Sequence, residues 1–106
     1  MKKIAIEEAF ATENLITAWR EMIADGAPGE PGMIHHLGRL INTNRGWGAQ
    51  VAERLVDLGA IRLEQMDANG IDMQVIAITS PGVQCLDADT GNALAAEAND
   101  ILAEEI

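Results

Sequence analysis

The chain has 106 residues, of which 48% are hydrophobic and 23% charged, a composition typical of a single globular domain. Its formal net charge of -10 argues against nucleic acids and anionic membrane surfaces as partners. No apolar run reaches the ~20 residues of a membrane span and no signal peptide is recognisable, so with a single cysteine, Cys85, we expect a cytoplasmic protein.

The first predicted element is a buried strand over residues 3–6, which runs directly into Glu7 and Glu8. Thr12 is the predicted N-cap of a helix that continues to Ala24. Residues 26–50 begin with the Pro/Gly-rich stretch GAPGEPGM, which breaks the helical pattern in the first connection between the two strands. A short helix is predicted within them, over residues 34–42.

Helical periodicity returns over residues 49–67, with a break predicted near Gly59 and a left-handed cap at Gly70. Residues 72–79 form a nearly continuous apolar run, which predicts a second buried strand parallel to the first. A final helix is predicted from about Asp89 onward. This order of strands and helices predicts an α/β fold with two parallel strands.

The last predicted helix ends with Glu104 and Glu105 and has no cap. Carboxylates are unfavourable at that pole of a helix, so we expect that the sequence stops while the helix is still running. Two parallel strands alone would also leave both edges of the sheet bare. We therefore interpret residues 1–106 as an N-terminal fragment, and we consider the case in which its first strand opens a (β/α)8 (TIM) barrel.

Glu7 is the candidate functional residue of the first strand. Strand alternation predicts that Ala5, Glu7 and Ala9 share the crowded barrel interior, with Ile4 and Ile6 facing the helices. A carboxylate at the mouth of a barrel needs a partner, and a divalent cation is a suitable one. The alternative left open by spacing is that the two glutamates are solvated residues at a strand end.

Four short motifs resemble those of amidohydrolase-related, metal-dependent enzymes. In chain order they are IAIEEAF, RLEQMDANGID, ITSPGVQ and ALAAEANDILAEEI. They are most similar to those of the decarboxylase branch that acts on gamma-resorcylate and 2,3-dihydroxybenzoate. Residues 26–50 match no motif of that group, which is why they are interpreted as an insertion.

The resemblance implies that Glu7 is a metal ligand. Many members of the group have a metal-binding histidine where this chain has Ala9, and an oxygen-richer site favours magnesium or manganese, with zinc still open. The other ligands of such enzymes, and the aspartate that donates the proton, would lie beyond residue 106. No catalytic residue is therefore assigned within this chain, and we expect the 106 residues alone to be inactive.

Substrate contacts are predicted at the end of the second strand, where Thr79, Ser80 and Gln84 could orient an aromatic acid by hydrogen bonds. Ordinary turn polarity around Ser-Pro-Gly is the competing interpretation. Phe10 could line the same pocket, although a lone aromatic residue beside a strand is more often part of the core.

The resemblance implies that residues 1–106 are the N-terminal fragment of a (β/α)8 (TIM) barrel. It also implies that the full-length protein is a divalent-metal-dependent, non-oxidative decarboxylase of a hydroxylated aromatic carboxylic acid. Its expected partner is that small substrate, and the expected assembly is a homo-oligomer. Two alternatives stay open. One is a metal-dependent hydrolase of the amidohydrolase superfamily, and the other is a non-catalytic small α/β module.

Overall fold

The computed structural model describes residues 1–27 and 31–106. Its two strands, β1 (Ile4–Phe10) and β2 (Met73–Ile78), pair in parallel and form a two-stranded sheet. The prediction of an α/β fold with two parallel strands is confirmed. Residues 28–30, in the predicted Pro/Gly-rich break, lie outside the described residues.

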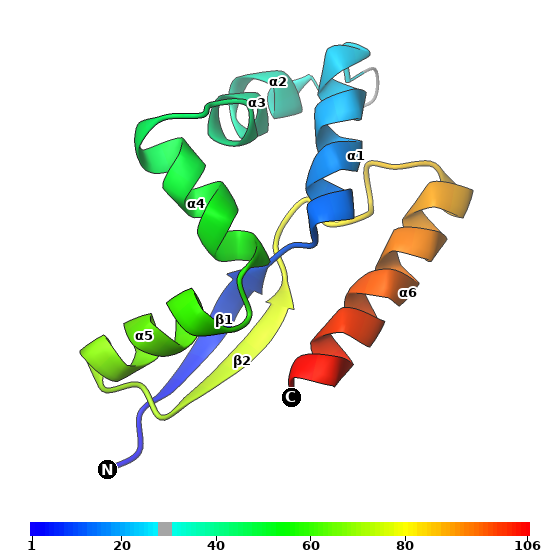
Figure 1. Ribbon diagram of the computed structural model, residues 1–106. Helices are drawn as coiled ribbons and strands as arrows, with labels where there is room; N and C mark the ends of the chain where they lie inside the picture. Colours follow the sequence, from blue (N-terminus) through cyan, green and yellow to red (C-terminus); the bar gives the residue numbers. More distant parts are fainter. Residues whose placement is uncertain (28–30) are drawn as a thin grey trace.

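Six helices complete the described part of the chain (Figure 1). They are α1 (Glu13–Ala24), α2 (Gly32–His35), α3 (Leu37–Ile41), α4 (Gly46–Val56), α5 (Ala60–Asn69) and α6 (Ala88–Glu105). Helices α1, α2 and α3 lie beyond the carboxyl ends of the two strands, whereas α5 and α6 lie beside the strands. No described helix is long and apolar enough to cross a membrane.

Local signals in the sequence explain several helix boundaries. The Thr12 hydroxyl accepts a hydrogen bond from the Leu15 N–H, which caps α1 as predicted. The predicted break near Gly59 separates α4 from α5, and Gly70 ends α5 in the left-handed conformation with φ of 64°. The short helix predicted over residues 34–42 is two single-turn helices, α2 and α3.

The core lies beyond the strand ends, where α1 packs against α3. It consists of buried apolar side chains from α1, α3 and the residue that follows β1: Ala11, Leu15, Ile16, Trp19, Leu37 and Ile41. The Trp19 indole N–H donates a hydrogen bond of 2.8 Å to the Gly82 carbonyl in the loop after β2. The core therefore supports the end of the sheet at which parallel α/β proteins place their functional groups.

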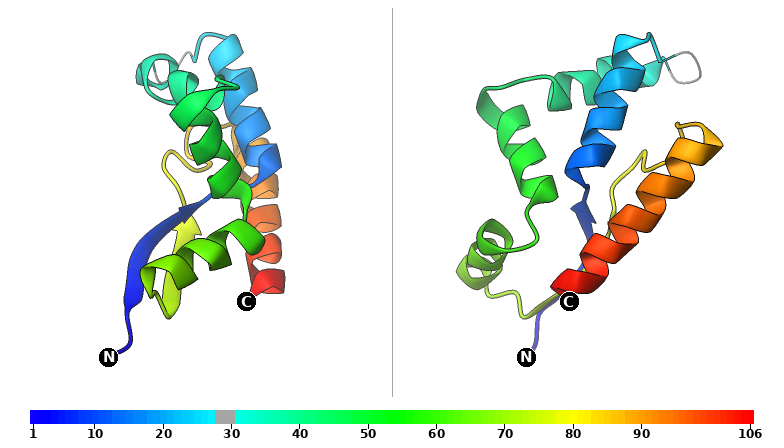
Figure 2. Two further views of the ribbon diagram at one scale, coloured as in Figure 1. Left: turned by 60° about the vertical axis from the view of Figure 1, so that its left-hand side comes forward. Right: turned by 45° about the vertical axis from the view of Figure 1, so that its right-hand side comes forward.

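The two faces of the sheet have different surroundings. On β2 the side chains alternate, with Gln74, Ile76 and Ile78 partly buried and the intervening residues exposed. Gln74 contacts Arg62 of α5, so the partly buried face is the one covered by helices. Figure 2 (left) shows the strands at one margin of the molecule with the helices to one side. The other face of the sheet is bare within the described chain.

Candidate functional site

Glu7 lies on a β-bulge in the middle of β1. Ala5 pairs with Gln74 and Glu8 pairs with Ile76, so three steps along β1 correspond to two steps along β2. Glu7 absorbs the extra residue with a φ of 61°, a conformation that non-glycine residues rarely adopt. Its side chain is exposed and makes no hydrogen bond or ion pair with residues 1–27 or 31–106.

The bulge overturns the predicted assignment of faces. Ile4 pairs with the exposed Met73, and Ile4 and Ile6 are themselves 53% and 69% exposed. They therefore lie on the bare face, whereas we predicted that they face the helices. Ala5, predicted for the barrel interior, shares the helix-covered face with its partner Gln74. Simple alternation fails because one inserted residue reverses the order of faces along the strand.

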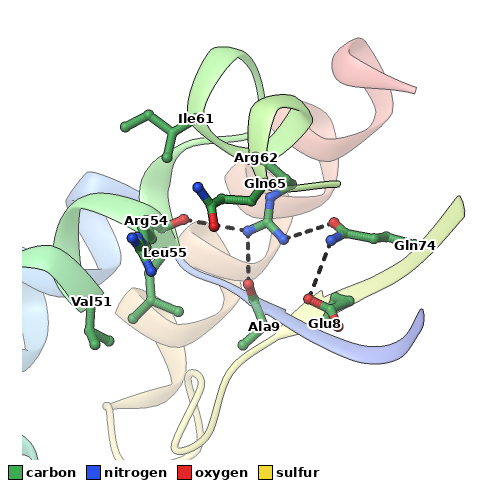
Figure 3. Close-up of a pocket in the computed structure, with 9 residues that line it drawn as sticks. All are labelled: Glu8, Ala9, Val51, Arg54, Leu55, Ile61, Arg62, Gln65 and Gln74. Atoms are coloured by element: carbon green, nitrogen blue, oxygen red, sulfur yellow. Dashed lines mark hydrogen bonds between the residues drawn. The ribbon is translucent and has the colours of Figure 1, made fainter. Parts of the chain in front are cut away.

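A cleft of about 310 Å³ lies between the strands and helices α4 and α5. Figure 3 shows the Arg62 side chain inside it, between the two strands and the loop that precedes α5. Its guanidinium donates to the carbonyls of Asp57 (2.9 Å) and Ala9 (2.9 Å) and to the Gln74 side-chain oxygen (3.1 Å). Gln74 in turn donates a longer bond of 3.4 Å to the Glu8 carboxylate.

Arg62 and Gln74 were not predicted as site residues from the sequence. The sequence contained one signal for Arg62. In the helical periodicity of residues 49–67, Arg62 lies at a position where an apolar residue facing the core is equally expected. It is also the last basic residue of the chain, followed by nine acidic residues. An arginine half-buried against a sheet must satisfy its N–H groups, so it hydrogen-bonds to nearby acceptors and can fix the position of the backbone that carries them.

The predicted substrate residues after β2 do lie together. Thr79, Ser80 and Gln84 line a cavity of about 360 Å³ formed by residues 78–84. The loop is held from both sides, because the Thr79 N–H donates to the Phe10 carbonyl (2.9 Å) and Trp19 donates to Gly82 (2.8 Å). Trp19 is a further residue that the sequence analysis missed, since nothing local links it to residues 63 positions away.

The predicted insertion also reaches this loop. A second cleft, of about 400 Å³, is lined by residues of α2 and α3 and by Ser80 and Pro81: Gly32, Met33, His36, Leu37, Leu40, Ser80 and Pro81. Residues 32–40 thus form a wall beside the end of β2. Their status as an insertion stays a prediction.

Phe10 is 1% exposed and pairs with Ile78 on β2. Its ring borders a cavity of about 270 Å³ together with the first turn of α1 and residues of α6. Such burial fits the core interpretation better than direct substrate contact. Near the strand ends the described chain thus presents polar groups, whereas Phe10, the aromatic residue of β1, is buried.

Comparison with known proteins relates this arrangement to one group of enzymes. No family model matches the chain. It is 32% identical over 105 residues to a gamma-resorcylate decarboxylase of Polaromonas sp. and 32% identical over 104 residues to that of Rhizobium radiobacter. These matches cover 98% and 97% of this chain, and 26% of each relative.

Solved structures agree with these matches. A point mutant of 5-carboxyvanillate decarboxylase from Novosphingobium aromaticivorans, with bound manganese and 3-methoxy-4-hydroxy-5-nitrobenzoic acid, superposes with a TM-score of 0.92 at 45% identity. Dihydroxybenzoic acid decarboxylase from Polaromonas sp., with manganese and 2-nitroresorcinol, superposes with a TM-score of 0.63 at 31% identity. The chain is therefore similar to one part of these decarboxylases.

The chain spans only part of the length of these enzymes. Each superposition covers 98% of this chain, but 30% of the first enzyme and 26% of the second. Residues 26–50 fall inside the matched span. The likeness supports the interpretation of the α/β unit as a portion of a (β/α)8 barrel.

In this chain, Glu7 fits a divalent metal as a single oxygen donor. Its carboxylate is exposed and unpaired among the described residues, and hard oxygen ligands suit magnesium and manganese. Residues 1–27 and 31–106 contain no group of three or more His, Cys, Asp or Glu side chains that could hold a metal ion. The described chain therefore offers one candidate ligand, not a complete metal centre.

Proposed function

We propose that this chain is part of a divalent-metal-dependent, non-oxidative decarboxylase of hydroxylated aromatic carboxylic acids, with manganese as the preferred metal. The observation that carries the proposal is the exposed, unpaired Glu7 carboxylate on the bulge of β1. It is supported by homology to decarboxylases whose structures contain manganese and nitro-substituted phenols. Hydrolysis remains the alternative activity, but none of the named relatives is a hydrolase.

In this proposal each group of the chain has a defined task. Glu7 supplies one anionic oxygen to the metal site. When bound, a divalent ion acts as a Lewis acid that orients a phenolic acid and stabilises negative charge on its oxygens. Thr79, Ser80 and Gln84 orient the substrate by hydrogen bonds, which keeps the ring carbon aligned for protonation before CO₂ leaves. We assign no proton donor to this chain.

Two further properties of the full-length protein belong to the proposal. We expect a homo-oligomer in the cytoplasm, as the resemblance and the single cysteine suggest. Sedimentation velocity of the full-length protein would test the oligomer directly.

The decisive experiment compares two adjacent glutamates in the full-length protein. Glu7→Gln should lose most bound manganese and most decarboxylase activity, because an amide oxygen is a weaker and uncharged ligand. Glu8→Gln should keep both, because Glu8 lies on the helix-covered face with its partner Ile76. Metal analysis and a CO₂-release assay provide the measurements. Equal manganese content in the two variants would contradict the proposal.

A further inference from the structure

Arg62 connects the two halves of β1 that the bulge separates. Its side chain bonds to Ala9, which follows the bulge, and to Gln74, whose register partner Ala5 precedes the bulge. The third bond, to the Asp57 carbonyl, fixes the guanidinium to the loop before α5. Figure 3 shows Ala9 and Gln74 around this planar group, together with the Arg54 carbonyl, to which the guanidinium donates a fourth, longer bond of 3.5 Å.

This arrangement bears directly on Glu7, although Arg62 does not touch it. Glu7 lies between the two anchored points and holds a φ of 61°, a strained conformation for a non-glycine residue that persists only where the surroundings maintain it. The sheet itself does not maintain it, because the regular pairing is interrupted between Ala5 and Glu8. The hydrogen bonds of the Arg62 guanidinium to Ala9 and Gln74 replace part of the restraint that the interrupted strand pairing does not supply.

We infer that Arg62 is a positioning residue for the metal centre: by bonding to Ala9 and Gln74 it fixes the bulge that presents the Glu7 carboxylate. This inference rests on the proposed function. A planar guanidinium is suited to the task, because it donates in fixed directions to several acceptors at once. A lysine ammonium carries the same charge but lacks this geometry.

The test uses the full-length protein, stripped of metal and titrated with Mn²⁺, with free Mn²⁺ measured by electron paramagnetic resonance. Arg62→Lys should weaken Mn²⁺ binding by roughly tenfold or more, the loss typical when a group that orients a metal ligand is removed. Glu7→Gln should abolish the binding. The melting temperature of every variant is measured in the absence of metal.

Two controls separate positioning from general stability. Arg54→Lys makes the same chemical change in the same cleft, where the Arg54 side chain donates no hydrogen bond to the described residues. Ile41→Val removes a methylene group from the buried core and lowers the melting temperature without touching the bulge. Both should keep the Mn²⁺ dissociation constant within about twofold of the wild-type value, well below the loss expected for a positioning residue.

The outcomes test the proposed function and the role of Arg62 separately. If Glu7→Gln binds Mn²⁺ as the wild type does, the proposed function fails. If Glu7→Gln loses the metal while Arg62→Lys behaves like Arg54→Lys, the proposed function stands and the inference on Arg62 is overturned. Should Arg62→Lys not fold, Gln74→Met decides, because it removes one of the four bonds that the guanidinium donates: weaker Mn²⁺ binding supports the inference and unchanged binding overturns it.

Discussion

At the scale of single residues, Glu7 combines an unusual backbone conformation with an exposed carboxylate. A strand residue that served only solubility would have no reason to occupy positive φ. Non-glycine residues in such conformations are found where the surroundings impose them, often at functional sites. Replacing Glu7 by a residue that tolerates positive φ should therefore raise the stability of the protein and weaken its metal binding.

Glu7→Gly should stabilise the metal-free protein while destroying the metal site. Glycine adopts a φ of 61° without steric cost, and this gain exceeds its added chain entropy by about 1 kcal/mol. Glu8→Gly is the matched control, because Glu8 is not at positive φ and should lose stability. Urea denaturation with a chelator present measures both. A loss of stability in Glu7→Gly comparable to that in Glu8→Gly would contradict the assigned strain.

At the scale of secondary-structure elements, the sequence was informative wherever the signal was local. Thr12 caps α1, a break near Gly59 separates α4 from α5, and Gly70 ends α5, all as predicted. The bulge in β1 carries no such signal, because its sequence contains no glycine and its register depends on β2, more than sixty residues away. For the same reason Glu7 could be chosen as a candidate, but its surroundings could not be derived.

The N-cap of α6 makes a prediction about pH. The exposed Asp87 carboxylate accepts a hydrogen bond of 3.0 Å from the Thr90 N–H, and this bond lowers the pKa of Asp87 below its ordinary value of 3.8. A lowered pKa in the folded state means that the ionised cap contributes fully above pH 3.8. The contribution is then lost as the pH falls through the lower folded value.

Asp87→Asn should therefore flatten the acid limb of the stability curve, because asparagine keeps a capping oxygen that does not titrate in this range. Thermal melts followed by circular dichroism, at a series of pH values on both sides of 3.8, provide the measurement. Asp89→Asn removes one charge from the first turn of α6 without removing the cap. An acid limb as steep in Asp87→Asn as in Asp89→Asn would refute the linkage.

At the scale of the whole molecule, the described chain is thin and one-sided. Its principal extents are 47 × 31 × 19 Å, and the helices lie to one side of the sheet (Figure 2, left). The bare face exposes four large apolar side chains: Ile4, Ile6, Met73 and Val75. Apolar surface of this kind in a parallel sheet is normally covered by further layers of structure.

We predict that the isolated 106-residue chain is inactive, binds divalent metal weakly through Glu7 alone, and self-associates through its bare face. Sedimentation velocity over a range of concentrations measures the association. Ile6→Lys combined with Val75→Lys should reduce it, because charge on the bare face opposes contact between copies. A concentration-independent monomer with one sharp unfolding transition would count against this prediction and favour the self-contained α/β module.

The hydrogen bond between Trp19 and Gly82 also makes the chain its own optical reporter. The sequence contains two tryptophans, and Trp47 is 74% exposed while Trp19 is fully buried. Replacing Trp47 by phenylalanine leaves a single indole, whose N–H donates to the loop that carries Thr79, Ser80 and Gln84. Indole emission depends on the polarity around the ring, so displacement of that loop by a ligand would shift the fluorescence of Trp19, with no label attached to the protein.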